Sequence, residues 1–161
     1  MLKIGVLSDT HQDFFEDIPQ RVLDELSGLD MIVHAGDFVS KPLLEGLMKR
    51  GQFKGVHGNM DSDEIKNEMP KTIQFEVNNF KIGVAHPAEG GDPSLIEQKV
   101  GSKFSDVDVI IHGHSHMPKN EMVNGVLHFN PGSASGAFPA IIQSIGILTI
   151  DDRISGEIIK L

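Results

Sequence analysis

The sequence predicts a mixed α/β fold that is parallel near the N-terminus and antiparallel near the C-terminus. Over the first third of the 161 residues, apolar runs of strand length alternate with segments of helical periodicity, as in βαβ units. These runs are almost continuously apolar, which is typical of strands buried on both faces. The last third contains short runs joined by two-residue turns, which indicate hairpins.

The first third supplies the parallel part. We expect strands over residues 2–7, 31–35 and 53–57. The first helix is predicted by apolar residues at helical spacing: Ile18, Val22, Leu26 and Leu29. The second helix follows Ser40, a candidate N-cap with Pro42 close behind. It carries an apolar stripe: Leu43, Leu44, Leu47 and Met48.

The rest of the chain contains three pairs of strands, one helix and one isolated strand. The turn residues Asn78-Asn79, Asn124-Gly125 and Asp151-Asp152 separate the paired strands, which cover 72–77 with 80–85, 121–123 with 126–129, and 144–150 with 154–161. A helix capped by Ser94 is expected to face inward with four side chains: Leu95, Ile96, Val100 and Phe104. A buried strand over 107–111 follows it.

Length and composition predict one domain over residues 1–161 and exclude several kinds of site. The chain has no cysteine, which excludes disulfides, zinc–thiolate sites, iron–sulfur clusters and thiol catalysis. No window reaches the ~18 apolar residues of a membrane span, and the first apolar run is too short for a signal peptide. We therefore expect a cytoplasmic protein that does not act in a membrane.

The net charge and the sequence motifs restrict the classes of ligand that the protein is expected to bind. The 14 basic and 23 acidic residues give a net charge of −9, so tight binding of nucleic acid is not expected. Neither G-x-G-x-x-G nor G-x-x-x-x-G-K-[ST] occurs, which argues against a dinucleotide site and a P-loop.

Five of the expected strands end in a short loop that carries a side chain able to bind a metal. Seven residues make up this set: Asp9, His11, Asp37, Asn59, His86, His114 and His116. Ligand sites in open α/β sheets form outside the carboxyl ends of the strands, so we expect these side chains to meet. If one carboxylate bridges, the set gives four contacts to each of two ions. Oxygen and imidazole ligands suit Mn, Fe, Zn or Ni, and ions about 3.5–4 Å apart suit phosphate ester chemistry.

The order of these motifs resembles the calcineurin-like metallophosphoesterases, and within them the small single-domain prokaryotic phosphodiesterases. The matching segments are Asp9-Thr10-His11, Gly36-Asp37, Gly58-Asn59-Met60-Asp61, His86, Gly113-His114-Ser115-His116 and Asn130-Pro131-Gly132-Ser133. Together they span residues 1 to about 135. The resemblance implies a four-layer α/β/β/α sandwich, in which two packed mixed β-sheets are flanked by helices.

The resemblance also implies roles for the seven ligands. One divalent ion would be held by Asp9, His11, Asp37 and His116, and the other by Asp37, Asn59, His86 and His114, with Asp37 as the bridge. Manganese is the first expectation, with nickel, iron or zinc as alternatives. The implied reaction is hydrolysis of a small phosphodiester, in which a metal-bound hydroxide attacks phosphorus in line without a covalent enzyme intermediate.

One departure from the family affects the expected activity. Many related chains have a histidine, thought to protonate the leaving oxygen, at the position of Met60, and a thioether cannot do this. We therefore expect slow hydrolysis of esters with poor leaving groups and faster hydrolysis of diesters of acidic alcohols or phenols. His57 could supply the proton or contact the substrate phosphate, and Asn59 and Ser133 are further candidates for substrate contact. Asp61 is expected to orient a water or a ligand.

The sequence leaves alternatives open both for the roles of three further histidines and for the function of the protein. His34, His112 and His128 are interpreted as core or strand-end residues rather than as further ligands. A competing function is an interaction scaffold of the same fold with a weak or silent metal site. A homo-oligomer is compatible with the sequence, which also leaves monoesters and diesters open as substrates.

Overall fold

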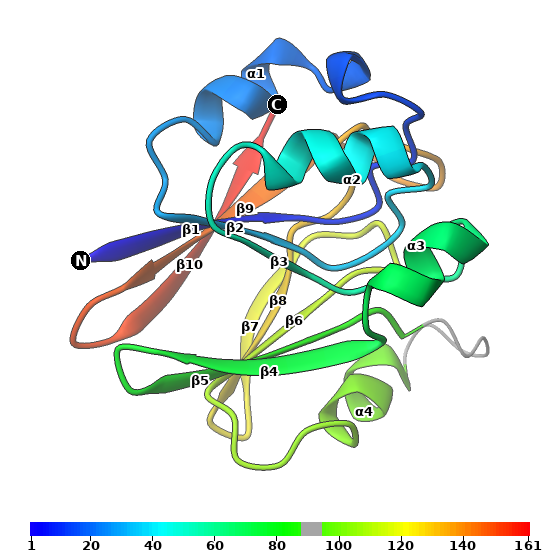
Figure 1. Cartoon of the computed structure of the whole chain (residues 1–161). Coiled ribbons are helices and arrows are strands. Elements are labelled where there is room, and N and C mark those ends of the chain that lie inside the picture. Colours follow the sequence, from blue (N-terminus) through cyan, green and yellow to red (C-terminus); the bar gives the residue numbers. More distant parts are fainter. Residues whose placement is uncertain (88–94) are drawn as a thin grey trace.

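The computed structural model describes residues 1–87 and 95–161, which form two five-stranded sheets packed face to face (Figure 1). The first sheet has the order β10-β9-β1-β2-β3. Its strands are β1 (Leu2–Leu7), β2 (Met31–His34), β3 (Phe53–Gly55), β9 (Ser144–Ile150) and β10 (Ile154–Lys160). The second sheet has the order β4-β5-β6-β8-β7. Its strands are β4 (Thr72–Val77), β5 (Phe80–Ala85), β6 (Val109–His112), β7 (Lys119–Val123) and β8 (Val126–Asn130).

Both sheets combine parallel and antiparallel pairs. In the first sheet β1, β2 and β3 are parallel, as predicted, while β9 runs antiparallel to β1 and β10 antiparallel to β9. In the second sheet β5, β6 and β8 are parallel. The outer strands complete the two predicted hairpins, β4 with β5 and β7 with β8. The carboxyl ends of the parallel strands therefore carry the connecting loops in which ligand candidates were expected.

Helices cover the outer face of each sheet and complete four layers. They are the 3₁₀ turn η1 (Phe15–Asp17), α1 (Gln20–Glu25), α2 (Lys41–Met48), α3 (Asp63–Glu68) and α4 (Ile96–Gly101). In Figure 1, α1 and α2 lie over the first sheet and α4 lies against the second. Separate apolar clusters fill the space between the sheets, the space under α1 and α2, and the space under α4. The α/β/β/α sandwich is confirmed.

Most expected elements are present, with differences at the helices. The Ser40 side chain accepts a hydrogen bond from the Leu43 N–H, so α2 begins where predicted. The predictions for Met48 and Leu95 are wrong, because both side chains are exposed. Met48 ends α2 one position beyond the buried Leu47, and Leu95 lies at the N-cap of α4, before the helix begins. The predicted cap Ser94 lies outside the described residues.

The described helices are short. The longest, α2, has eight residues, well below the ~20 needed to cross a bilayer, and no helix among residues 1–87 and 95–161 qualifies as a membrane span. The single domain over 1–161 and the cytoplasmic location stay predictions.

The three histidines interpreted as core residues are buried. His34 is the clearest case: its Nδ1 accepts a hydrogen bond from the Gly36 N–H, so Nε2 carries the proton and donates to Thr10 Oγ1 at 2.6 Å. The ring also stacks on Phe38. Burial disfavours the charged ring and lowers the pKa of His34 to about 3.

Acid should destabilise the fold through His34. The unfolded chain binds a proton on this ring below pH ~6.5, whereas the native ring stays neutral down to about pH 3. Stability from this group is therefore full above pH ~6.5 and is lost as pH falls toward 3. Between pH 7 and pH 4.5 we expect a loss of about 2–3 kcal/mol. Urea unfolding should show a smaller loss in His34→Gln than in the wild type, and equal losses would contradict the prediction.

Candidate metal centre

Loops from both sheets meet at the carboxyl ends of the parallel strands. The Asp9 N–H, just after β1, donates to the Gly36 carbonyl after β2 at 3.0 Å. From the second sheet, the His114 N–H after β6 donates to Asp9 Oδ2 at 3.1 Å. Segments more than 100 residues apart in sequence are thereby joined into one site.

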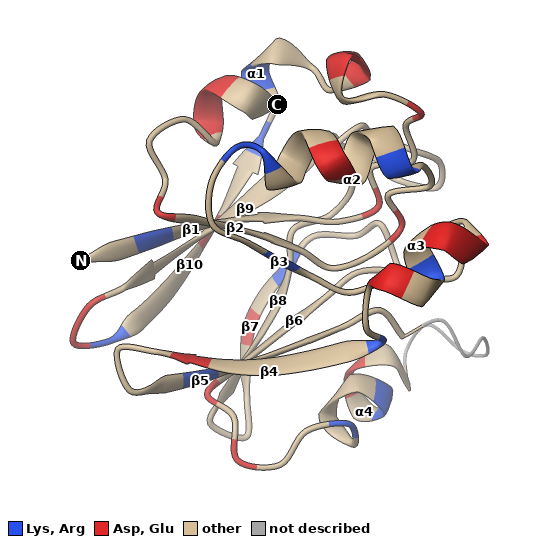
Figure 2. Cartoon of the chain, viewed as in Figure 1, with Lys and Arg blue, Asp and Glu red and all other residues tan. Residues whose placement is uncertain are grey.

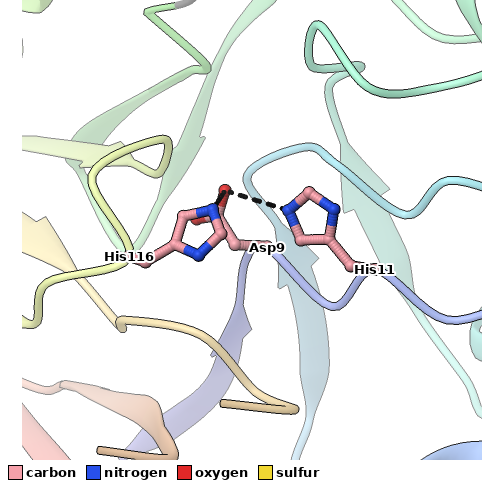
Figure 3. Close-up of side chains that lie close together, drawn as sticks. All are labelled: Asp9, His11 and His116. Atoms are coloured by element: carbon pink, nitrogen blue, oxygen red, sulfur yellow. Dashed lines mark ion pairs between the residues drawn. The ribbon is translucent and has the colours of Figure 1, made fainter. Parts of the chain in front are cut away.

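Five predicted ligands form two overlapping clusters, in each of which the ligand atoms lie within 4.8 Å of one another. The first contains Asp9, His11 and His116 (Figure 3). The second contains Asp9, Asp37 and His86. Asp9 Oδ1 lies 3.3 Å from His116 Nε2, and Asp37 Oδ2 lies 3.3 Å from His86 Nε2 and 3.7 Å from His11 Nε2. Both carboxylates are buried.

The other two predicted ligands lie at the border of these clusters. The His114 ring packs edge-on against the His86 ring, with centroids 5.3 Å apart. Asn59 is exposed and lines a pocket together with His57 and His86. His114 belongs to neither cluster, but its ring contacts that of His86, which belongs to one; Asn59 shares the wall of the pocket with His86.

Hydrogen bonds orient the two buried imidazoles. His86 Nδ1 lies 2.7 Å from the Ala35 carbonyl and His116 Nδ1 lies 2.9 Å from the Ala137 carbonyl. Because a carbonyl can only accept, each Nδ1 donates and Nε2 faces the carboxylates, as in metal-binding histidines. The buried Nε2 atoms of His11 and His86 make no well-aligned hydrogen bond within the described residues, although both lie within 4 Å of Asp37 Oδ2. Such unsatisfied buried atoms call for an unseen partner, and a divalent cation fits this donor set.

The carboxylates and imidazoles stabilise one another's charged forms. Burial opposes ionisation of Asp9 and Asp37, but hydrogen bonds and charges from His116 and His86 outweigh it and lower the pKa of both carboxyl groups. Burial likewise opposes protonation of His86 and His116, yet the same carboxylates raise the pKa of both rings. Buried anions of this kind favour a cation in the site, with which protons on the two rings would compete.

Backbone strain is concentrated at the predicted ligands. Five of them have φ in the left-handed region, which non-glycine residues rarely adopt: Asp9, His11, Asp37, His114 and His116. Such strain persists only where surrounding structure enforces it and is typical of functional sites.

Two further residues support the ligands. Asp61 accepts hydrogen bonds from the backbone N–H groups of Asp37 (3.0 Å), Gly58 (2.7 Å) and Val39 (2.7 Å), which ties the loops after β2 and β3 together. Asp61 therefore orients the ligand loops by binding their backbone N–H groups. Ser8, which the sequence analysis missed, donates to Asp9 Oδ2 at 2.7 Å. The sequence signal that could have identified Ser8 is a hydroxyl residue directly before an aspartate at the end of a strand.

The structure places the candidates for substrate contact differently. The side chain of Ser133 is fully buried, and its contact with a substrate stays a prediction. Its hydroxyl donates to the Asp9 carbonyl at 2.7 Å and accepts from the Ala137 N–H, so it holds the loop of Asp9. His57 is half-buried and lines the pocket with Asn59. Met60 is exposed, and its N–H donates to Asp37 Oδ1 at 2.8 Å.

Gly58 leaves the space that Asp37 occupies. A Cβ added at Gly58 would lie 2.1 Å from Asp37 Oδ1, so Gly58→Ala must displace this carboxylate. We expect Mn²⁺ binding to weaken by about 10–100-fold, the usual effect of disturbing groups that position a ligand. Isothermal titration calorimetry would measure it, with Gly101→Ala at the end of α4 as the control, since nothing lies within 4 Å of that Cβ. Equal affinities for the two variants would contradict the prediction.

Comparison with known proteins gives one consistent result. Residues 2–153 match the family model of the calcineurin-like phosphoesterase superfamily domain. A probable metallophosphoesterase of Methanocaldococcus jannaschii is 34% identical over 98% of this chain and 81% of its own. A phosphodiesterase of the same organism is 29% identical over 98% of this chain and 99% of its own.

Solved structures agree with this result. One described as a novel archaeal phosphodiesterase is 27% identical, with a TM-score of 0.77 over 99% of this chain and 100% of its own. Vps29 of Entamoeba histolytica, solved in complex with zinc, is 25% identical, with a TM-score of 0.77 over 99% of both chains.

Proposed function

The chain belongs to the calcineurin-like phosphoesterase superfamily, and from that membership we propose that it is a phosphodiesterase that hydrolyses a small phosphodiester with two divalent metal ions, manganese first among them. The observation that carries the proposal is the meeting of buried carboxylates and imidazoles from four loops in two overlapping clusters. Relatives described as phosphodiesterases support the choice of a diester.

Each metal would have its own set of ligands. We assign Asp9, His11, Asp37 and His116 to one ion, and Asp37, Asn59, His86 and His114 to the other. The position of Asp37 supports a bridging role, because its Oδ2 is within 4 Å of His11 from one set and His86 from the other. When bound, such a pair of ions supplies an activated water as the nucleophile and offsets the charge of the phosphate.

The chain's own groups then position the substrate. The carbonyls of Ala35 and Ala137 keep the Nε2 atoms of His86 and His116 directed at the site. The exposed Asn59 side chain would hold a phosphate oxygen beside His86. His57, on the same pocket, would contact the phosphate or protonate the leaving oxygen, a role that the Met60 thioether cannot fill.

Removal and return of metal tests the proposal. Protein stripped with a chelator should hydrolyse bis(4-nitrophenyl) phosphate at least about 100-fold more slowly than protein reloaded with Mn²⁺. Parallel reloading with Ni²⁺, Fe²⁺ and Zn²⁺ ranks the metals, and anomalous scattering from crystals grown without added metal identifies the bound ion. If the stripped and reloaded proteins had the same rate, the proposal would fail.

A scaffold function is the second candidate. The likeness to Vps29 of Entamoeba histolytica in complex with zinc favours it, as does the exposed Met60 at the position of the missing acid. Under this alternative the protein would have a weak or silent metal site and would hydrolyse the diester no faster than the same ions in buffer. The reloading experiment therefore separates the two candidates.

A further inference from the structure

One border of the candidate metal centre carries exposed apolar side chains. Met117 directly follows the proposed ligand His116 and is 50% exposed, and Phe138, on the loop after β8, is 94% exposed. Single exposed apolar residues are ordinary on a protein surface, but apolar side chains gathered at a site mark the surface on which a ligand or partner is bound. We call Met117 and Phe138 the apolar rim.

Hydrogen bonds hold the loop of Phe138 beside His116. The residue before Phe138 is Ala137, whose carbonyl accepts a hydrogen bond from His116 Nδ1 at 2.9 Å. The Ala137 N–H donates to Ser133 Oγ, also at 2.9 Å, and the Ser133 hydroxyl donates to the carbonyl of Asp9. The loop that carries Phe138 is therefore attached to two proposed ligands of the same ion.

This border of the site belongs to a part of the chain that has no formal charge. The chain has 14 basic and 23 acidic residues among 161, yet none of them falls between Glu121 and Asp151. Figure 2 accordingly shows β8, β9 and the connection between them in tan. A group that lies on the loop of Phe138 meets no charged side chain from that loop. The surface therefore suits an uncharged, apolar group.

The border of the site beside His86 is polar. The pocket there has His57, Asn59 and Thr72 in its wall, and none of its described lining residues is Leu, Ile, Val, Met or Phe. The two substituents of a phosphodiester would therefore meet two different surfaces at this centre. His57, the candidate for protonating the leaving oxygen, lies on the polar border, so we expect the leaving group there. The substituent that stays on phosphorus then faces the apolar rim.

We infer that the substrate is an asymmetric phosphodiester whose retained substituent is apolar and is bound by Met117 and Phe138, an inference that rests on the proposed function. Covering exposed apolar side chains with an apolar group removes both surfaces from water, which is favourable in proportion to the area buried. The metal ions attract the phosphate of every diester alike. The apolar rim is therefore the part of the site that distinguishes one diester from another.

A matched pair of substrates tests the inference. Methyl 4-nitrophenyl phosphate and hexyl 4-nitrophenyl phosphate share the leaving group, the scissile bond and the charge, and they differ only in the length of the retained alkyl group. The Mn²⁺-loaded wild type should prefer the hexyl ester by at least about 10-fold in kcat/KM, mainly through KM. The preference should persist in sodium sulfate, which strengthens apolar association, whereas a preference based on charge would shrink as ionic strength rises.

Variants assign the preference to the apolar rim. Phe138→Ser and Met117→Ser should each reduce it by at least about 3-fold, and Phe138→Leu, which keeps an apolar side chain, should retain most of it. Met122→Ser is the control, because this side chain is exposed on β7, outside the loops of the metal centre. The preference of the control should equal that of the wild type.

Three results would overturn the inference. The first is equal kcat/KM for the two esters in the wild type, and the second is an unchanged preference in Phe138→Ser. The third is a dimer, seen by sedimentation velocity at assay concentrations, that dissociates in Phe138→Ser, because the apolar rim would then contact a second copy of the chain. Failure of the proposed function looks different: neither ester would be hydrolysed in a metal-dependent way, and the inference would fall with it.

Discussion

Replacing Asp37 with asparagine is expected to lower kcat/KM for phosphodiester hydrolysis by about 10³-fold or more. The carboxylate is 2% exposed, and its Oδ2 lies within 4 Å of ring nitrogens assigned to two different ions. An amide has the same size but no charge, and it cannot offer two anionic oxygens to two cations. The loss should therefore come from the metal centre and not from packing.

The measurement compares activity and metal content. Asp37→Asn would be assayed on bis(4-nitrophenyl) phosphate with saturating Mn²⁺, and calorimetry would count the ions bound. The asparagine Oδ1 can still accept from the Met60 N–H, so the variant should fold. Asp152→Asn, in the exposed turn between β9 and β10, serves as the control. Retention of more than a tenth of the activity by Asp37→Asn would exclude a bridging role.

The parts of the fold predicted from sequence are those set by local pattern. The strands of the first sheet and the three hairpins follow from apolar runs and turn residues, and they are confirmed. The pairing of β9 with β1 was not predictable, because Leu2 pairs with Ile150, almost the whole chain apart. Helix α3 escaped prediction because it buries one side chain, Ile65, which gives no periodicity.

In the candidate site, too, the features set by local sequence pattern were predicted and those set by long-range packing were not. Ligand candidates were found because each follows a strand directly, and parallel strands deliver such residues to one edge. The burial of Ser133 could not be predicted, because the sequence places this residue near the site without showing that its hydroxyl donates to the Asp9 carbonyl. The pocket beside the candidate metal centre was missed because His57, Thr72 and His86, which line it, come together only after the two sheets have packed.

The exposed side chain of Met60 suggests a gain of function. Its backbone N–H donates to the proposed bridging residue Asp37, so the residue borders the metal centre, and the side chain is 57% exposed. An imidazole at this position could donate a proton to the leaving oxygen. General acid catalysis contributes about 10²–10⁴-fold, so Met60→His should accelerate hydrolysis of alkyl phosphodiesters by about 10²-fold, the lower end of that range. Diesters of 4-nitrophenol need little protonation and should change much less.

The dependence of rate on leaving group distinguishes acid catalysis from a general improvement of the site. A series of diesters with leaving groups of increasing pKa should give a shallower fall in kcat/KM for Met60→His than for the wild type. The variant should also gain a descending limb in its pH–rate profile above the pKa of the new imidazole, near pH ~6.5. Met122→His, at a position on β7 that is also exposed and lies outside the loops of the candidate metal centre, should behave as the wild type. Parallel plots for Met60→His and the wild type would show that the lack of an acid at position 60 does not limit hydrolysis, and would make His57 the first candidate for the group that protonates the leaving oxygen.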